Sequence, residues 1–237
     1  MNVRIFDDAA GASRAVARLI ARQLELQPAS VLGLPTGRTS VAVYKELVRL
    51  GPDFSRARTF NLDEFVGVPA HRRTFHAFMD RHLFCRVNLP AGRGHFLDGD
   101  AKDLEAECAR FERAIAAAGG IDLLVLGIGA NGHIGFNEPG KALFARTHRA
   151  RLTAATRRAN AGLFAGRASE VPREALSMGM GTILAARAIV LIATGRSKAR
   201  AINAMFSGRI TPSVPASFLQ LHQDTTLVLD RAASQGL

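Results

Sequence analysis

The stretch Ile121-Asp-Leu-Leu-Val-Leu-Gly-Ile-Gly-Ala-Asn-Gly-His-Ile-Gly-Phe-Asn-Glu-Pro139 joins an apolar run to a glycine-rich turn with three polar side chains. The apolar run from Leu123 to Leu126 predicts a buried strand. In open α/β sheets the ligand crevice lies beyond the carboxyl ends of the strands. His133, Asn137 and Glu138 therefore fall where such a sheet binds its ligand, and they predict an enzyme site.

The same turn contains the spacing Gly-x-Gly-x-x-Gly at 127–132, which is typical of dinucleotide-binding proteins. That motif must open a helix, yet Gly135 and Pro139 follow within a few residues and would interrupt one. It also comes past the middle of the chain, not at its first strand. We therefore expect no dinucleotide at this turn.

Strands alternate with helical patterns along the chain. Short apolar runs predict strands at 3–6, 31–34, 58–62, 123–126, 176–180, 188–193 and 226–229. Apolar residues at helical spacing predict helices at 9–24, 74–83, 103–118, 197–206 and 217–222, and one that ends at Leu50. This alternation predicts an α/β fold: one domain over 1–237 with a mostly parallel, Rossmann-like sheet and helices on both faces.

Composition indicates a cytoplasmic protein. The 237 residues are 48% hydrophobic, contain no apolar run of membrane-spanning length and include only two cysteines, Cys85 and Cys108. The net charge is +11, but the arginines are scattered over many predicted elements and there is no tryptophan to form an aromatic platform. We expect neither a nucleic acid nor a membrane as partner, and a positive surface can still attract anionic substrates.

Two further segments carry candidate chemistry. The turn Leu34-Pro-Thr-Gly-Arg-Thr-Ser40 leads from a strand into a helix, whose free N–H groups can bind a phosphate. It lacks the lysine and spacing of a P-loop, and a plain helix cap by Thr36 or Thr39 is the alternative. Farther on, Asp63 and Glu64 end a strand, where one carboxylate can abstract a proton beside a carbonyl or imine carbon; the alternative is again a cap.

Cations that could reach a phosphate occur in Thr156-Arg-Arg-Ala-Asn160 and Gly195-Arg-Ser-Lys198, for which surface charge is the alternative. A metal site is not indicated. The histidines near Cys85, which are His71, His76, His82 and His95, lack paired cysteines and the histidine spacing of a metalloprotease helix.

Taken together, the chain resembles the glucosamine-6-phosphate deaminases over nearly its full length. The shared motifs are Leu-Gly-Leu-Pro-Thr-Gly at 32–37, Thr-Phe-Asn-Leu-Asp-Glu-Phe-Val-Gly at 59–67, Gly-His-Ile-Gly-Phe-Asn-Glu-Pro-Gly at 132–140, Arg-Thr-His at 146–148, Thr-Arg-Arg-Ala-Asn at 156–160 and Ser-Lys-Ala at 197–199. Several long motifs in the right order are more specific than any one of them. The broader relatives are 6-phosphogluconolactonases and sugar-phosphate isomerases.

The resemblance implies an isomerising deamination of glucosamine 6-phosphate to fructose 6-phosphate and ammonia, without a metal or an organic cofactor. His133, supported by Glu138 and Asn131, would open the sugar ring, and Asp63 would move a proton from C2 to C1. The stretch from about 146 to 171 would be a mobile lid that excludes water. The residues implied to bind the phosphate are Thr36, Gly37, Arg38, Thr39, Arg157 and Lys198.

Three departures from the family pattern stand out. Asn131 replaces an aspartate that many relatives carry, and it can orient an imidazole but cannot neutralise an imidazolium. Arg38 replaces a glycine, so it either adds a charge near the phosphate or obstructs it if the backbone there needs a positive φ. His148 and Ala150 occupy positions that are basic in the allosterically activated members.

Two other classes of function stay open at this stage. One is a lactonase or isomerase acting on another 6-phosphosugar, which would release no ammonia. The other is a sugar-phosphate-sensing regulator, which would need a DNA-binding helix-turn-helix, whereas this chain begins at once with its first strand. The partner in each case is a small sugar phosphate, and a homo-oligomer is possible.

Overall fold

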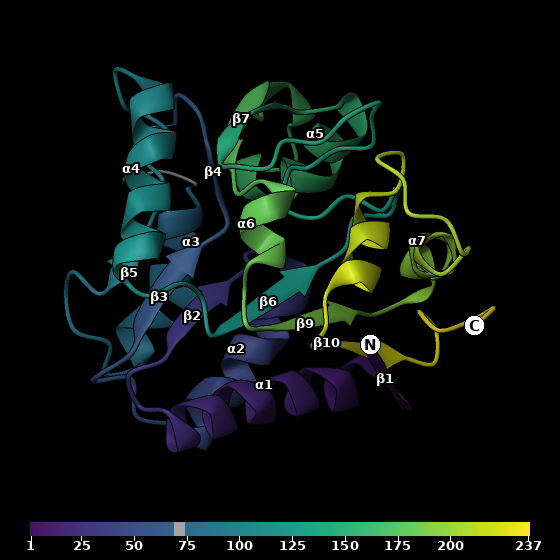
Figure 1. The fold of residues 1–237 in the computed structure, drawn as a ribbon, viewed down its shortest axis with the longest axis horizontal. Coiled ribbons are helices and arrows are strands. Elements are labelled where there is room, and N and C mark those ends of the chain that lie inside the picture. Colours follow the sequence, from purple (N-terminus) through teal and green to yellow (C-terminus); the bar gives the residue numbers. More distant parts are fainter. Residues whose placement is uncertain (69–73) are drawn as a thin grey trace.

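A seven-stranded sheet, parallel at every pairing, forms the centre of the computed structural model, which describes residues 1–68 and 74–237 (Figure 1). In spatial order the strands are β1 (Asn2–Phe6), β10 (Thr225–Asp230), β9 (Ala188–Ala193), β6 (Leu123–Gly127), β2 (Val31–Leu34), β3 (Arg58–Asn61) and β5 (Gly94–His95). Neighbouring strands are far apart in the sequence, so the connections between them must cross the sheet as helices. The predicted α/β fold is confirmed.

Helices cover both faces of this sheet (Figure 1). Within β6, Leu123 and Val125 pack on one face, while Leu124 and Leu126 pack on the other, because successive side chains of a strand alternate. The first face carries α1 (Ala9–Leu26), α2 (Arg38–Leu50) and α3 (Phe75–His82). The second face carries α4 (Leu104–Ala117), α6 (Met180–Leu184), α7 (Ala199–Met205) and the 3-10 helix η5 (Pro215–Leu221).

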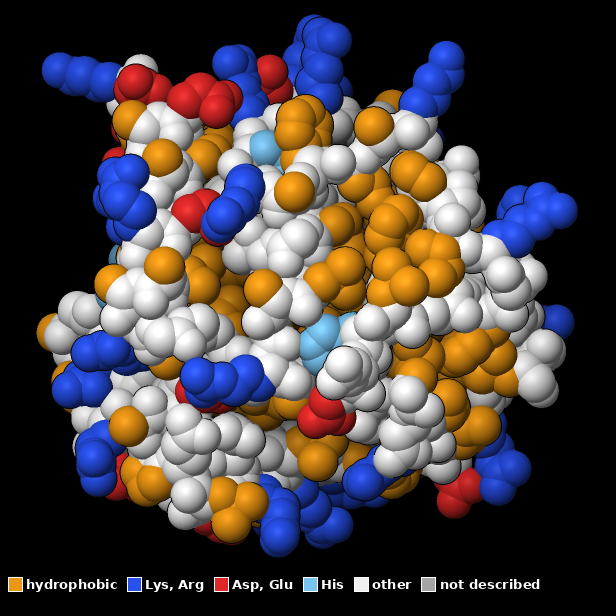
Figure 2. Space-filling view, in the orientation of Figure 1, with side chains coloured by type: hydrophobic (Ala, Val, Ile, Leu, Met, Phe, Trp, Pro, Cys, Tyr) orange, Lys and Arg blue, Asp and Glu red, His pale blue; other side chains and the backbone are white. Residues whose placement is uncertain are grey.

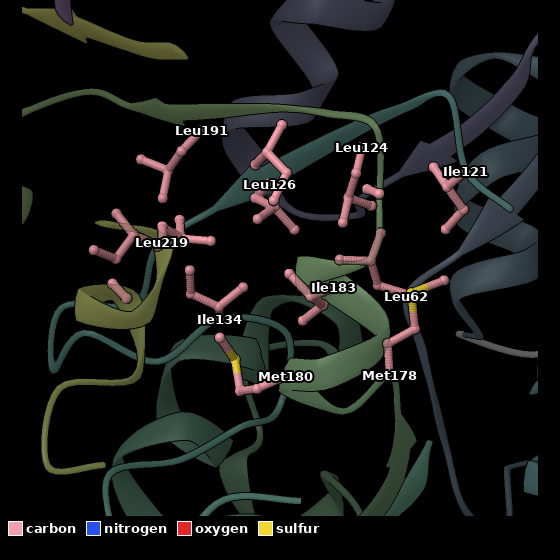
Figure 3. Packing of buried hydrophobic residues seen from close by; sticks show 14 of the residues in the cluster. Leu62, Ile121, Leu124, Leu126, Ile134, Met178, Met180, Ile183, Leu191 and Leu219 are labelled. Atoms are coloured by element: carbon pink, nitrogen blue, oxygen red, sulfur yellow. The ribbon is translucent and has the colours of Figure 1, made fainter. Parts of the chain in front are cut away.

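The core on the second face also holds the glycine-rich turn in place. Figure 3 shows Leu124, Leu126 and Leu191 of the sheet on one side of a cluster that includes Ile134 of the turn and Ile183 of α6. Ile134 and Ile183 are completely buried. Burying an isoleucine side chain contributes about 1.5–3 kcal/mol, so the turn is anchored by its apolar residue while its polar residues remain available.

A second, smaller sheet lies beyond the carboxyl ends of the central strands (Figure 1). It consists of β4 (Asp63–Phe65), β8 (Glu174–Ser177) and β7 (His148–Arg151), all antiparallel. The segment between β7 and β8 contains α5 (Ala154–Asn160) and the 3-10 helices η2 (Ala161–Phe164) and η3 (Ala168–Glu170). Four phenylalanines packed together beside this small sheet form a separate aromatic core: Phe65, Phe75, Phe136 and Phe164.

Two expectations about local structure are corrected. The strand predicted at 176–180 ends at Ser177, and α6 begins at Met180. The reason is Gly179: a Cβ there would lie 2.2 Å from the carbonyl oxygen of Arg146, so the chain must turn where only glycine fits. The helix predicted at 217–222 is the longer 3-10 helix η5. Among the described helices, none is long and apolar enough to cross a membrane.

Candidate active site

Three polar residues of the glycine-rich turn form one network after β6. Asn131 Nδ2 donates to Glu138 Oε2 at 2.9 Å, and Asn131 Oδ1 accepts from the backbone N–H of His133 at 3.2 Å. The Nδ1 atom of His133 lies 3.7 Å from the same Glu138 oxygen, which is an ion-pair distance and too long for a hydrogen bond. Asn131 therefore holds both the turn and the carboxylate that faces the imidazole.

No helix follows this turn, because the chain from Ile128 to Thr147 is irregular. The interruption of a helix expected from Gly135 and Pro139 is therefore found. Asn137, expected to line the crevice, instead donates from Nδ2 to the carbonyl oxygens of Ile134 and Met178 and is 2% exposed. Its amide fixes the turn from within.

The imidazole of His133 rests directly on Gly129. A Cβ at Gly129 would lie 2.3 Å from Cε1 of the ring, so any larger residue would displace it. Nδ1 of His133 is buried and has no hydrogen-bond partner among the described residues. The ring is thus fixed by close packing against Gly129 and lies beside the Glu138 carboxylate. Nε2 is the ring nitrogen on the side away from that carboxylate.

Glu138 connects the turn to the segment between β7 and β8. Its Oε1 accepts from the hydroxyl of Thr156 in α5, and Oε2 accepts from Asn131. Burial raises the pKa of the Glu138 carboxyl, but its interactions with His133, Thr156 and Asn131 together outweigh burial and hold the pKa below its usual value. Glu138 is therefore ionised at neutral pH and can stabilise a positive charge on His133.

Asp63 approaches the same turn from β4. A Cβ at Gly135 would lie 3.7 Å from Oδ2 of Asp63, so the carboxylate lies against the turn that carries His133. Asp63 is 9% exposed. Burial, followed by the charge of Glu64, raises its pKa to about 8. A carboxyl of this kind can both accept and release a proton near neutral pH.

The neighbouring Glu64 has a structural role and points elsewhere. Its carboxylate accepts hydrogen bonds from the backbone N–H groups of Phe65, Phe75 and His76, the last two at the start of α3. Burial raises the pKa of Glu64 to about 7, although these three hydrogen bonds oppose the change. The alternative of a helix-capping carboxylate thus applies to Glu64.

The turn between β2 and α2 presents free backbone donors. Gly37 occupies the N-cap of α2 with a φ of 111°, and no side chain caps the helix, so the simple cap by Thr36 or Thr39 is not found. Arg38 is the first residue of α2, and in the described part of the chain Ala165 is the one non-glycine residue with a positive φ. The backbone at Arg38 therefore accommodates a side chain without strain.

Of the two predicted cations, Lys198 lies near this turn and Arg157 is engaged elsewhere. Lys198 Nζ donates to the carbonyl oxygen of Ile128 at 2.6 Å. Burial and then the charge of Arg38 lower the pKa of Lys198, which places the two cations close together. Arg157 donates to carbonyl oxygens within 168–171, so its guanidinium holds the backbone of the segment between β7 and β8.

A cavity of about 450 Å³ is lined in part by Glu138 and by residues of β7. Its charged lining includes Arg149, Arg151 and Glu174, of which Arg149 and Glu174 form an ion pair at 2.5 Å.

Lys and Arg side chains are spread around the rim of the face in Figure 2 and do not gather in one patch, as the scattered arginines predict. Among the described residues no three His, Cys, Asp or Glu side chains are grouped to bind a metal, and His71 lies outside those residues.

Sequence reasoning missed two parts of this site. Gly129 is adjacent to the motif, but only the three-dimensional structure places it under the imidazole. Thr156 begins a motif noted for its arginines, yet its own hydroxyl makes the contact with Glu138. Neither residue type signals such a role by itself.

Comparison with known proteins agrees with these observations. Residues 7–228 match the model of the family described as glucosamine-6-phosphate isomerases/6-phosphogluconolactonase. The chain is 48% identical to a glucosamine-6-phosphate deaminase of Rhodopirellula baltica, with 99% of this chain and 95% of the relative aligned. It is 46% identical to the deaminase of Halothermothrix orenii, with 99% of each aligned.

Solved structures show the same relationship. A monomeric glucosamine-6-phosphate deaminase superposes with a TM-score of 0.96 at 39% identity, and 99% of each chain is covered. A 6-phosphogluconolactonase from Trypanosoma cruzi reaches a TM-score of 0.80 at 18% identity, with 100% of this chain and 96% of the other covered. This second likeness shows the fold alone.

Proposed function

Because the chain belongs to the glucosamine-6-phosphate isomerase/6-phosphogluconolactonase family, we propose that it converts glucosamine 6-phosphate and water into fructose 6-phosphate and ammonia. The reaction is an aldose–ketose isomerisation coupled to hydrolytic deamination. One observation carries the proposal: the buried carboxylate of Asp63 and the paired side chains of His133 and Glu138 lie at the same glycine-rich turn.

The first step is opening of the sugar ring. A cyclic hemiacetal opens when its ring oxygen gains a proton and its C1 hydroxyl loses one, and an imidazole can carry that proton. Since Nδ1 of His133 faces Glu138, Nε2 is the nitrogen available to the sugar. The ionised Glu138 stabilises the imidazolium that forms, and Asn131 holds Glu138 in place.

The second step is proton transfer between carbons, which we assign to Asp63. In its ionised form it removes the proton from C2 and returns it to C1, while the C1 carbonyl oxygen gains the proton that the C2 ammonium group loses. This leaves a protonated imine at C2 that water hydrolyses to the ketone and ammonia. The free carboxyl has a raised pKa of about 8. The ammonium group on C2 of the substrate would lower that pKa on binding, because an opposite charge favours the ionised form.

We assign phosphate binding to the turn between β2 and α2 and to nearby cations. Thr36, Gly37 and Thr39 offer backbone and hydroxyl donors, and Arg38 and Lys198 offer positive charge. Arg157 stays in this proposal as a residue of the lid, 146–171, whose closure would bring it toward the phosphate and exclude water.

Under this proposal the enzyme acts in the cytoplasm as one domain, alone or as a homo-oligomer, with no metal or organic cofactor. The test is ammonia release by the purified protein with glucosamine 6-phosphate, galactosamine 6-phosphate and 6-phosphogluconolactone. We expect ammonia and fructose 6-phosphate in equal amounts from glucosamine 6-phosphate. Lactone hydrolysis without ammonia from either amino sugar would instead favour a lactonase, and binding without turnover would favour a sugar-phosphate sensor.

A further inference from the structure

Three consecutive carbonyl oxygens of the turn between β2 and α2 are each held by a side chain. The carbonyls belong to Leu34, Pro35 and Thr36. Their donors are, in order, Nδ2 of Asn61 at 3.0 Å, Oη of Tyr44, and Oγ of Ser40 at 3.2 Å. These contacts connect the turn to β3 on one side and to the first two turns of α2 on the other.

All three donors are removed from solvent. Asn61 is completely buried, Tyr44 is 1% exposed and Ser40 is 5% exposed. A buried polar group that loses its partner is strongly unfavourable, so each donor opposes rotation of the peptide group that it holds. The turn is therefore fixed by side chains behind it, although its outer residues Gly37 and Arg38 are exposed.

The fixed carbonyls determine where the N–H groups point. In a trans peptide the C=O and the N–H of the next residue point in opposite directions. When the carbonyls of Pro35 and Thr36 are directed inward at Tyr44 and Ser40, the N–H groups of Thr36 and Gly37 are directed outward. Within residues 1–68 and 74–237, neither N–H donates to another group of the protein.

We propose that Tyr44, Ser40 and Asn61 are positioning residues that hold this turn in the orientation that binds the substrate phosphate. The inference rests on the proposed function, since the anion is the phosphate of the proposed sugar substrate. None of the three side chains touches the anion. They act through the peptide groups, which are arranged before the ligand arrives, so binding requires little reordering of the turn.

The test compares Tyr44→Phe and Ser40→Ala with a matched control, Ser13→Ala. Ser13 of α1 is 2% exposed and donates to the carbonyl oxygen four residues earlier, at Ala9, just as Ser40 does to Thr36. Each variant removes one oxygen atom and leaves the apolar packing in place. The readouts are kcat and KM for glucosamine 6-phosphate, the dissociation constant of inorganic phosphate by calorimetry, and thermal stability.

We expect KM and the phosphate dissociation constant to rise together, by about tenfold in Tyr44→Phe and about threefold in Ser40→Ala. The value of kcat should stay within about twofold, because the lost interaction acts equally in the ground and transition states. In Ser13→Ala, KM and phosphate binding should not change, whatever the effect on thermal stability.

Unchanged KM and phosphate affinity in both site variants would overturn the inference, and so would an equal rise in the Ser13→Ala control. If Tyr44→Phe does not fold, Ser40→Ala still decides between these results. If the proposed function is wrong, wild-type protein will release no ammonia. The phosphate titrations still compare the variants in that case, so the two failures can be told apart. Wild-type protein that neither turns over nor binds phosphate would overturn both.

Discussion

Burial of Asp63 should make the folded protein less stable as the pH rises, and replacing this residue by asparagine should remove that loss. The pKa of the carboxyl is about 8 in the folded protein against an ordinary value of 3.8. Between these values the unfolded chain is ionised at this group while the folded protein is protonated. The free energy of unfolding then falls by about 1.4 kcal/mol for each pH unit.

The contribution of the Asp63 carboxyl to stability is fully present below pH 3.8 and is lost as the pH rises to about 8. From about pH 5.5 to about pH 7.5, wild-type protein should lose roughly 3 kcal/mol through this one carboxyl. Asparagine has nearly the same shape and does not titrate, so Asp63→Asn should be more stable than wild type at the higher pH.

Urea denaturation followed by circular dichroism at the two pH values measures this difference. Titrating groups that do not interact with Asp63 are common to both proteins and cancel when the two are compared; Glu64, whose charge raises the pKa of Asp63, is the exception. Asp100→Asn is the control, since Asp100 is exposed to solvent, and its pH dependence should match that of wild type. If Asp63→Asn loses as much stability between the two pH values as wild type does, the Asp63 carboxyl is not buried in its neutral form.

Three further predictions concern the turn after β6 and the cavity beside it. His133→Ala should slow the forward reaction, which starts from the closed ring, more than the reverse reaction from ammonia and fructose 6-phosphate; equal losses in initial rates would indicate a binding role. Gly129→Ala should reduce kcat at least about tenfold, because its Cβ would lie 2.3 Å from the imidazole; near-normal kcat would mean that the ring can shift freely. N-acetylglucosamine 6-phosphate should not activate the enzyme, because His148 and Ala150 stand at the positions that are basic in the activated members and offer no pair of cations for its phosphate; a sigmoidal substrate curve that becomes hyperbolic on its addition would contradict this.

Six of the seven central strands could be predicted from the sequence because they are short runs between amphipathic helices; the seventh, β5 (Gly94–His95), could not, since two residues without an apolar side chain give no strand signal. Of the small sheet, the strand predicted at 176–180 indicates the end of β8, and the rest could not be predicted. Its strand β7 reads His-Arg-Ala-Arg and pairs with β8 across more than twenty residues, so neither composition nor local periodicity indicates it. Strand β4 follows β3 after one residue, Leu62, and joins the other sheet, which makes the two look like one strand in the sequence.

The candidate site likewise has a part that the sequence predicts and a part that it does not. Asn131, His133 and Glu138 lie within eight residues of one another, so the sequence already places them together. The contact of Glu138 with Thr156 depends on how the segment after β7 folds back, which no local pattern encodes. The bond from Tyr44 to Pro35 is hidden for a different reason: Tyr44 lies on the buried face of a helix, where its ring satisfies the apolar pattern and conceals the hydroxyl.

The assignment of proton transfer to Asp63 is tested most directly by steady-state ammonia release from glucosamine 6-phosphate by wild type, Asp63→Asn and Glu64→Gln at about pH 9. At that pH the wild-type carboxyl is ionised, since its pKa is about 8. We predict that Asp63→Asn lowers kcat about 1000-fold with KM within a few-fold of wild type, because only the base is lost. Glu64→Gln should keep kcat within about threefold, since Glu64 caps α3. Near-normal turnover by Asp63→Asn, or a greater loss of kcat in Glu64→Gln, would mean that Asp63 is not the base.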